Sequence, residues 1–178
     1  MATWDYTKVK MIGSGTYGKV YEVTKDKKTY ALKKIFNEDY DTDGFDDTTL
    51  REIDIILRAN HPNIINCKAW HIKKDILYLI MDKADYDLND WVNNMPDKHC
   101  VNTFKKYAFG ILCGLKYLHD NKIIHGDIKP ENMLIFDSTK SIQLADFGLL
   151  VHHYPGKKIP STYNYSQWFR PIDLMMKN

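Results

Sequence analysis

The sequence has no long apolar run, few cysteines and almost no net charge. Its longest unbroken apolar run, residues 76–81, is far too short to span a bilayer. Cys67, Cys100 and Cys113 are odd in number and lack metal-ligand spacing, so we expect reduced thiols. The net charge of +2 is too small to predict nucleic acid or an anionic membrane as the main partner.

The chain also lacks a targeting signal at its start. No basic stretch followed by an apolar one opens it, so we do not expect secretion and predict an intracellular location, in the cytoplasm or nucleus. With 178 residues, 44% of them apolar and 27% charged, the composition is that of a globular domain.

Short β-branched or aromatic segments between turn-forming residues predict strands in the first half of the chain. We expect them at residues 6–12, 20–24, 29–35, 64–70 and 76–81. Residues 48–59 have Leu50, Ile53 and Leu57 at helical spacing, with Ile56 beside them, and Pro62 prevents that helix from continuing. The layout predicts a five-stranded antiparallel sheet with one helix.

The second half of the chain is predicted to be mainly helical, with helices at 87–95 and 101–119. The longer helix has one apolar face, formed by Phe104, Ala108, Ile111, Leu115 and Leu118. Short strands are expected at 133–136 and 142–144, followed by a loop after residue 148. We therefore predict an α+β fold with a small lobe at 1–83 and a second lobe at 84–178.

A glycine-rich segment, Gly13-Ser-Gly15-Thr-Tyr-Gly18, joins the first two expected strands. Glycines let backbone N–H groups approach phosphate oxygens closely, because no Cβ atom intervenes. A dinucleotide site would place a helix after the glycines, whereas here a strand follows at Val20. A glycine-rich hairpin without a ligand is the alternative.

Lys33 is predicted to point toward the protein interior, because its neighbours Ala31 and Ile35 do and side chains alternate along a strand. A buried ammonium needs an anion, and Glu52 in the expected helix is the natural partner. The alternative for Glu52 is a capping box with Thr49, which has the required spacing.

A second polar segment runs from His125 to Asn132 and is followed by Asp146-Phe-Gly. It places a carboxylate at Asp127, an ammonium at Lys129 and an amide at Asn132, with a second carboxylate at Asp146. Such a set can position a hydroxyl, neutralise a phosphate and hold magnesium, which phosphoryl transfer requires.

The order of these motifs resembles that in the N-terminal part of a eukaryotic-type protein kinase. The motifs are the glycine-rich loop, the Ala-x-Lys strand, the helix glutamate, the His-x-Asp loop and Asp-Phe-Gly. Lys129, two residues after Asp127, follows the serine/threonine pattern. The loop residues Thr16 and Tyr17 and the late Trp168-Phe-Arg170 are most similar to the cyclin-dependent branch.

The resemblance implies ATP and Mg²⁺ as cofactors and a protein with a Ser or Thr acceptor as substrate. Lys33, Glu52, Asp127 and Lys129 would be catalytic, and Asn132 with Asp146 would hold the metal. The implied nucleotide site comprises Ile12, Gly13, Ser14, Gly15, Thr16, Tyr17, Gly18, Lys19, Val20, Ala31, Lys33, Met81, Asp82, Ala84 and Leu134. His125 would be structural and not a base.

Three features depart from the family pattern. Gly126 replaces the arginine that would meet a phosphate on the activation segment, so phosphorylation at Ser161 or Thr162 should have a blunted effect. The usual Ala-Pro-Glu appears as residues 171–173, Pro-Ile-Asp. The chain stops at Asn178, so the resemblance implies a C-lobe that is incomplete after the activation segment, as in a fragment, a disrupted gene product, or half of an assembly.

The sequence also leaves other functions open. A truncated, inactive nucleotide-binding or interaction module is the main alternative, and a non-functional remnant is another. A cyclin-like or other protein could bind the 48–59 helix or the apolar face of 101–119. The acidic loop at 39–44 copies half of a calcium-binding loop but lacks the glutamate at its end, and His152-His153 lacks further ligands, so neither predicts a metal site.

Overall fold

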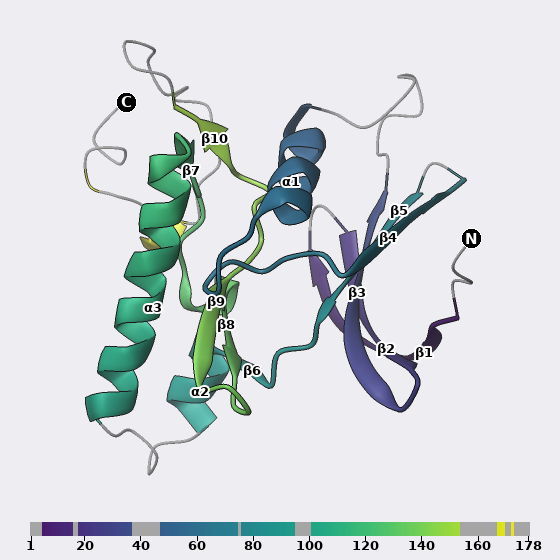
Figure 1. Ribbon diagram of the computed structural model, residues 1–178, viewed down its shortest axis with the longest axis horizontal. Helices are drawn as coiled ribbons and strands as arrows, with labels where there is room; N and C mark the ends of the chain where they lie inside the picture. The colour runs from purple at the N-terminus through teal and green to yellow at the C-terminus, as the bar shows by residue number, and fades with distance from the viewer. Residues whose placement is uncertain are drawn as a thin grey trace. The chain divides into compact units, whose positions relative to one another are not determined.

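The computed structural model describes residues 5–15, 18–36, 47–74, 76–94, 101–153, 167–169 and 172. The chain divides into two compact units, residues 1–59 with 65–84, and residues 60–64 with 85–178. Figure 1 shows the elements of each unit. Among the helices of the described ranges, none combines the length and the apolar character that crossing a membrane would need.

The first unit is built on a five-stranded antiparallel sheet (Figure 1). Asp26 and Lys27, at φ +49° and +61°, form the tight turn between its second and third strands, because two-residue hairpins favour left-handed backbone. The predicted sheet with one helix is confirmed. Its spatial order is β1 (Thr7–Gly15), β2 (Gly18–Lys25), β3 (Lys28–Phe36), β5 (Ile76–Asp82) and β4 (Ala69–Lys73).

Side chains alternate between two faces of this sheet. The inner face is the one that carries Lys33, and the register places Val20, Ala31, Ile35, Leu77, Leu79 and Met81 on it as well. The outer face is the opposite one, where buried Val23, Leu32 and Ile80 form a small cluster with half-buried tyrosines packed against it.

Helix α1 (Asp47–Arg58) buries Thr49, Glu52, Ile55 and Ile56. Leu50 and Leu57, whose spacing predicts the helix, are 49% and 42% exposed. The helix was therefore predicted correctly, but the stripe at Leu50 and Leu57 is not the face that it buries.

The expected strand at 64–70 is wrong over most of its length, because β4 begins at Ala69. Residues 60–64 belong to the second unit, where the Asn63 carbonyl accepts a hydrogen bond from the Leu144 amide at 2.9 Å. The Asn63 side chain also donates to the Ile142 carbonyl at 2.8 Å, and Ile64 forms an isolated parallel bridge with Leu144. Within the expected strand, the Cys67 amide donates to the Ile56 carbonyl of α1 at 3.1 Å and not to a neighbouring strand.

The second unit contains small sheets and helices. Strands β6 (Tyr86–Asp87), β8 (Met133–Phe136) and β9 (Ser141–Leu144) form one sheet, and β7 (Ile123–Ile124) pairs with β10 (Val151–His152). Helix α2 (Leu88–Asn94) starts one residue later than predicted, because the Asp87 carboxylate caps it by accepting the Asp90 amide at 2.7 Å. Two 3-10 turns, η2 (Pro130–Asn132) and η3 (Gln167–Phe169), complete the described elements. The loop predicted after residue 148 contains β10.

The long helix α3 (Val101–Asp120) lies against β9 (Figure 1). Two glycines of the helix lie close to Asn63: a Cβ at Gly110 would lie 2.8 Å from Asn63 Nδ2, and one at Gly114 would lie 2.9 Å from the Asn63 carbonyl oxygen. Of the predicted apolar face, Leu118 is buried, whereas Phe104 is 59% exposed. The sequence marks this face as a candidate surface for a partner, and Ala108, Ile111 and Leu115 on it are half-buried.

Candidate active site

The first unit contains the predicted ion pair between Lys33 and Glu52. Lys33 Nζ on β3 meets Glu52 Oε1 on α1, and the two side chains are 12% and 1% exposed. The capping-box alternative is wrong, because α1 begins at Asp47 and Thr49 is already its third residue. A carboxylate with this little exposure requires a cation close by, so Lys33 and Glu52 depend on each other.

The glycine-rich segment spans the end of β1 and the start of β2. Gly13 pairs with Val20, and Gly15 pairs with Gly18. Gly18 has φ +151°, and a Cβ there would lie 2.2 Å from the Lys34 carbonyl oxygen, so this position admits only glycine. Ile12, Ser14 and Lys19 are exposed on the same hairpin, while Thr16 and Tyr17 lie outside the described residues.

The other residues of the expected nucleotide site lie on elements of both units. Val20, Ala31, Lys33 and Met81 share the inner face of the sheet, where Ala31 pairs with Met81 across β3 and β5. Asp82 ends β5, and Ala84 follows it with its carbonyl accepting from Lys83 at 3.4 Å. Leu134, half-buried on β8, is in the second unit.

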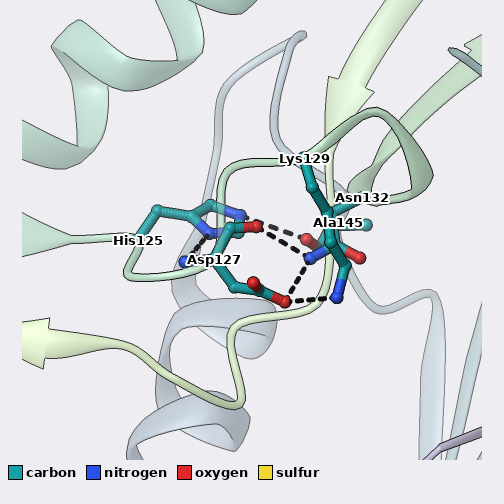
Figure 2. A network of polar contacts seen from close by, with 5 residues as sticks. All are labelled: His125, Asp127, Lys129, Asn132 and Ala145. Carbon is teal, nitrogen blue, oxygen red and sulfur yellow. Dashed lines mark hydrogen bonds and ion pairs between the residues drawn. The ribbon is translucent and has the colours of Figure 1, made fainter. Parts of the chain in front are cut away.

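In the second unit, Asp127 is the centre of a polar network (Figure 2). Its Oδ2 atom accepts a hydrogen bond from Asn132 Nδ2 at 2.9 Å and lies 2.7 Å from Lys129 Nζ. Asn132 Nδ2 also donates to the Asp127 backbone carbonyl at 2.8 Å. The Asp127 side chain is 7% exposed and that of Lys129 is 25% exposed. The carboxylate is therefore held in one orientation by two donors.

His125 supports this loop and is not placed to act as a base. The Asp127 amide donates to His125 Nδ1 at 3.3 Å, so His125 Nε2 carries the proton and donates to the Ala145 carbonyl at 3.1 Å. Burial lowers the pKa of His125, although the Ala145 carbonyl and the charges of Asp146 and Asp127 act in the opposite direction. The ring packs on Phe147 with centroids 5.0 Å apart.

Asn132 connects this loop to the segment that carries Asp146. Its backbone carbonyl accepts from the Ala145 amide at 2.9 Å. Asp146 itself has φ +62°, which is a left-handed backbone conformation. Non-glycine residues adopt it rarely, and those that do are found more often at functional sites. Sequence reasoning missed Ala145, since its contribution is entirely through backbone groups.

The donor set at Asn132 and Asp146 fits magnesium. Carboxylate and amide oxygens are hard ligands, and Mg²⁺ is commonly held by one or two carboxylates together with substrate phosphates and water. The amide nitrogen of Asn132 is committed to Asp127, so the amide oxygen is the atom that would bind a metal. Within the described ranges, no group of three or more His, Cys, Asp and Glu side chains is placed to hold a metal ion.

Gly126 has a structural requirement that the sequence does not reveal. It has φ +84°, and the segment after Asp146 passes close to it. That segment is bound to the start of the loop by the β7–β10 pairing and by the His153 amide, which donates to the Lys122 carbonyl at 2.8 Å. Of the later residues singled out, Ser161, Thr162 and Arg170 lie outside the described residues, and Trp168 is 92% exposed.

Comparison with known proteins agrees with this arrangement. A family model described as "Protein kinase domain" matches residues 6–178. "Cyclin-dependent kinase G1" of Arabidopsis thaliana is 36% identical over 183 residues, covering 97% of this chain and 29% of that protein. "CTD kinase subunit alpha" of Saccharomyces cerevisiae is 34% identical over 183 residues, covering 96% of this chain and 32% of that protein.

A solved structure, the crystal structure of the yeast RNA Pol II CTD kinase CTDK-1 complex, has a chain similar to this one. The TM-score is 0.84 at 29% sequence identity, covering 100% of this chain and 56% of the other. The chain spans about a third of the length of the curated relatives it matches. It belongs to the protein kinase family, with cyclin-dependent kinases among its relatives.

Proposed function

We propose that this chain is an ATP- and Mg²⁺-dependent kinase that transfers the γ-phosphate of ATP to serine or threonine hydroxyls of proteins. The observation that carries the proposal is the Asp127 carboxylate, 7% exposed and held between Lys129 and Asn132. An acceptor hydroxyl reaching this carboxylate would meet a fixed proton acceptor beside a cation, which suits phosphoryl transfer.

In the proposed reaction, the acceptor oxygen forms a bond to the γ-phosphorus while the bond from that phosphorus to the bridging oxygen breaks and ADP leaves. Asp127 orients the hydroxyl and takes its proton. Lys129 lies 2.7 Å from the Asp127 carboxylate, so it can balance negative charge on the transferred group. Magnesium, when bound through Asn132 and Asp146, supplies further neutralisation of the phosphates.

In the first unit, we propose that Lys33 contacts the α- and β-phosphates while Glu52 fixes its position. Glu52 is buried, and its ion pair restricts the rotamers of Lys33. The backbone from residue 12 to residue 20 would cover the phosphates, and Val20, Ala31, Met81 and Leu134 would contact the base. The backbone of Asp82 and Ala84 would bind the base edge.

The test of this function is transfer of label from γ-labelled ATP to a generic basic protein in the presence of Mg²⁺. We expect labelled phosphoserine or phosphothreonine, and no transfer once the magnesium is chelated. Label found on tyrosine alone, or no label from a folded protein, would overturn the proposal. A thermal-shift titration with Mg·ATP separates binding from catalysis, because a ligand at about 100 times its Kd stabilises by about 2.7 kcal/mol.

The second candidate is an inactive interaction module, and one observation favours it. Helix α3 exposes several large apolar side chains, which on a soluble domain mark an interface. Nucleotide-induced stabilisation without phosphoryl transfer would support this candidate over the kinase. The exposed fractions are 65% for Val101, 59% for Phe104, 69% for Phe109 and 64% for Leu112.

We further propose that a cyclin-like protein binds the first unit at α1. The helix exposes Leu50 and Leu57, and Trp70 and Ile72 on the edge strand β4 are 56% and 52% exposed. Such large apolar side chains outside the core favour a protein partner. We place the protein inside the cell, which agrees with free thiols at Cys67 and Cys113, the two cysteines within the described ranges.

A further inference from the structure

The outer face of the sheet in the first unit carries a lysine or an aromatic ring on each of its strands. The register and the alternation of side chains fix this placement. The residues concerned are Lys8 on β1, Lys19, Tyr21 and Lys25 on β2, Lys28, Tyr30, Lys34 and Phe36 on β3, Tyr78 on β5, and His71 and Lys73 on β4.

Two pairs of these lysines are direct cross-strand partners. Lys19 pairs with Lys34, and Lys25 pairs with Lys28, so like charges face each other across β2 and β3. Such pairs destabilise a sheet. Among the described strand residues of the outer face, Asp82 is the one carboxylate, and it pairs with Lys68 at 2.9 Å. A face this rich in lysines attracts a polyanion.

Lysine ammonium groups lie over two of the aromatic rings of this face. Lys8 Nζ lies 3.5 Å from the ring centroid of Tyr21, and Lys34 Nζ lies 5.6 Å from that of Tyr78. Tyr21 and Tyr78 also pack against the buried outer-face cluster. A ring that packs on the core with one side can stack on a nucleobase with its other side. A lysine beside the ring can then bind the phosphate next to that base.

We propose that the outer face of this sheet binds single-stranded RNA. An acidic peptide would use the lysines but leave the rings without a role, whereas RNA uses both, and aromatic rings on an antiparallel sheet are a recurring way of stacking unpaired bases. From Tyr21 on β2 to His71 on β4 the face spans three strand spacings, about 14 Å, enough for a short run of nucleotides.

The whole-chain net charge of +2 predicted no nucleic acid partner because it sums the charges of the whole sequence. The sequence from residue 38 to residue 47 contributes Glu38 and several aspartates, which offset in the total the lysines of the sheet. Binding depends on the local potential, so a basic face can bind RNA on a chain that is nearly neutral overall. The proposal is independent of the proposed kinase reaction, since none of its test residues belongs to the expected catalytic or nucleotide set.

The first experiment measures fluorescence anisotropy of a labelled oligouridine of about twelve nucleotides as salt is raised. The variant Lys25→Glu/Lys28→Glu/Lys34→Glu should bind at least about tenfold more weakly, and its slope of log K against log salt should fall by about 2. The control Lys105→Glu/Lys106→Glu/Lys122→Glu makes the same charge change in the second unit and should stay within about twofold of wild type. Equal losses in both variants, or no binding by wild type, would overturn the proposal.

The second experiment separates stacking from charge. Tyr21→Leu should weaken binding about fivefold or more, while Tyr21→Phe, which keeps the ring, should bind as wild type does. Circular dichroism and thermal melting confirm that each variant is folded. If both variants bind equally, or if polyglutamate displaces the RNA as well as unlabelled oligouridine does, the face recognises acidic proteins instead. Tighter binding of the matching single-stranded DNA would overturn the assignment to RNA.

Discussion

The carbonyl oxygen of Leu149 occupies the space that a side chain at Gly126 would need. An ideal Cβ on Gly126 would lie 2.0 Å from this oxygen and 2.9 Å from the carbonyl carbon, and φ at Gly126 is +84°. The loop that carries Asp127 and the segment after Asp146 therefore approach each other closely. The family pattern has an arginine at this position, but the backbone geometry here leaves no room for any side chain.

Replacing Gly126 should destabilise the protein. We expect Gly126→Ala to lower the free energy of unfolding by about 1–3 kcal/mol, because alanine at positive φ is strained and its Cβ overlaps Leu149. Urea denaturation measures the change. The control is Gly13→Ala, where a Cβ would make ordinary contacts at 3.7 Å, and where we expect no loss of stability. Equal stability of the two variants would refute the steric argument.

Phosphorylation of the activation segment should have little effect on activity. Gly126 cannot bind a phosphate as an arginine would, so we expect Ser161→Ala to change turnover by less than about tenfold, or 1.4 kcal/mol. Initial rates of the variant and of phosphatase-treated wild type provide the measurement. A larger loss in a protein that is still folded would show that another cation performs the role of the arginine.

Breaking the Lys33–Glu52 pair should cost both stability and nucleotide affinity. We expect Glu52→Gln to reduce the free energy of unfolding by about 1–3 kcal/mol, since the Lys33 ammonium, 12% exposed, loses its anion. Binding of Mg·ATP should weaken about tenfold, or 1.4 kcal/mol, as Lys33 is no longer fixed. Urea denaturation and a thermal-shift titration measure the two effects.

The control for Glu52→Gln lies on the same helix. Asp54 forms an exposed pair with Arg58, so Asp54→Asn should change stability by less than about 0.5 kcal/mol. If Glu52→Gln behaves like this control, the buried pair does not stabilise the first unit in the way we infer.

The buried imidazole of His125 should make stability depend on pH. Burial lowers the pKa of His125 below its ordinary 6.5, so the unfolded chain takes up a proton at a higher pH than the folded one. The contribution of the neutral, buried His125 to the free energy of unfolding is therefore complete above pH 6.5. It is lost as the pH falls from 6.5 toward the pKa of His125 in the folded protein. Melting temperatures across that range should fall less steeply in His125→Phe than in wild type. The exposed His119→Phe controls for loss of one imidazole, and identical slopes in all three proteins would contradict the argument.

Local rules were sufficient to predict the five-stranded sheet, apart from the start of β4, and the Lys33–Glu52 pair. The strands follow from short β-branched or aromatic segments between turn-forming residues, and the pair follows from the alternation of side chains and the need of a buried ammonium for an anion. The β8–β9 hairpin was also predicted within a residue, because its strands are apolar and bounded by turn-forming residues.

Features that depend on backbone contacts between distant residues could not be predicted from the sequence. Gly110 and Gly114 of α3 lie close to Asn63, yet hydrophobic periodicity gives glycine no weight. The same holds for Gly126, where the sequence records a lost arginine but not the Leu149 carbonyl beside it. Residues 64–68 have strand-like composition, and the hydrogen bonds of Asn63 to the second unit decide otherwise.

The most direct test of the account is the rate of phosphoryl transfer by Asp127→Asn. This change keeps the size of the side chain but removes the proton acceptor that Lys129 and Asn132 hold in place. We predict that transfer to the basic protein falls by about 10²- to 10⁴-fold, while stabilisation by Mg·ATP persists and the exposed-site control Asp120→Asn retains the wild-type rate. Retention of more than about a tenth of the wild-type rate by Asp127→Asn would contradict the account.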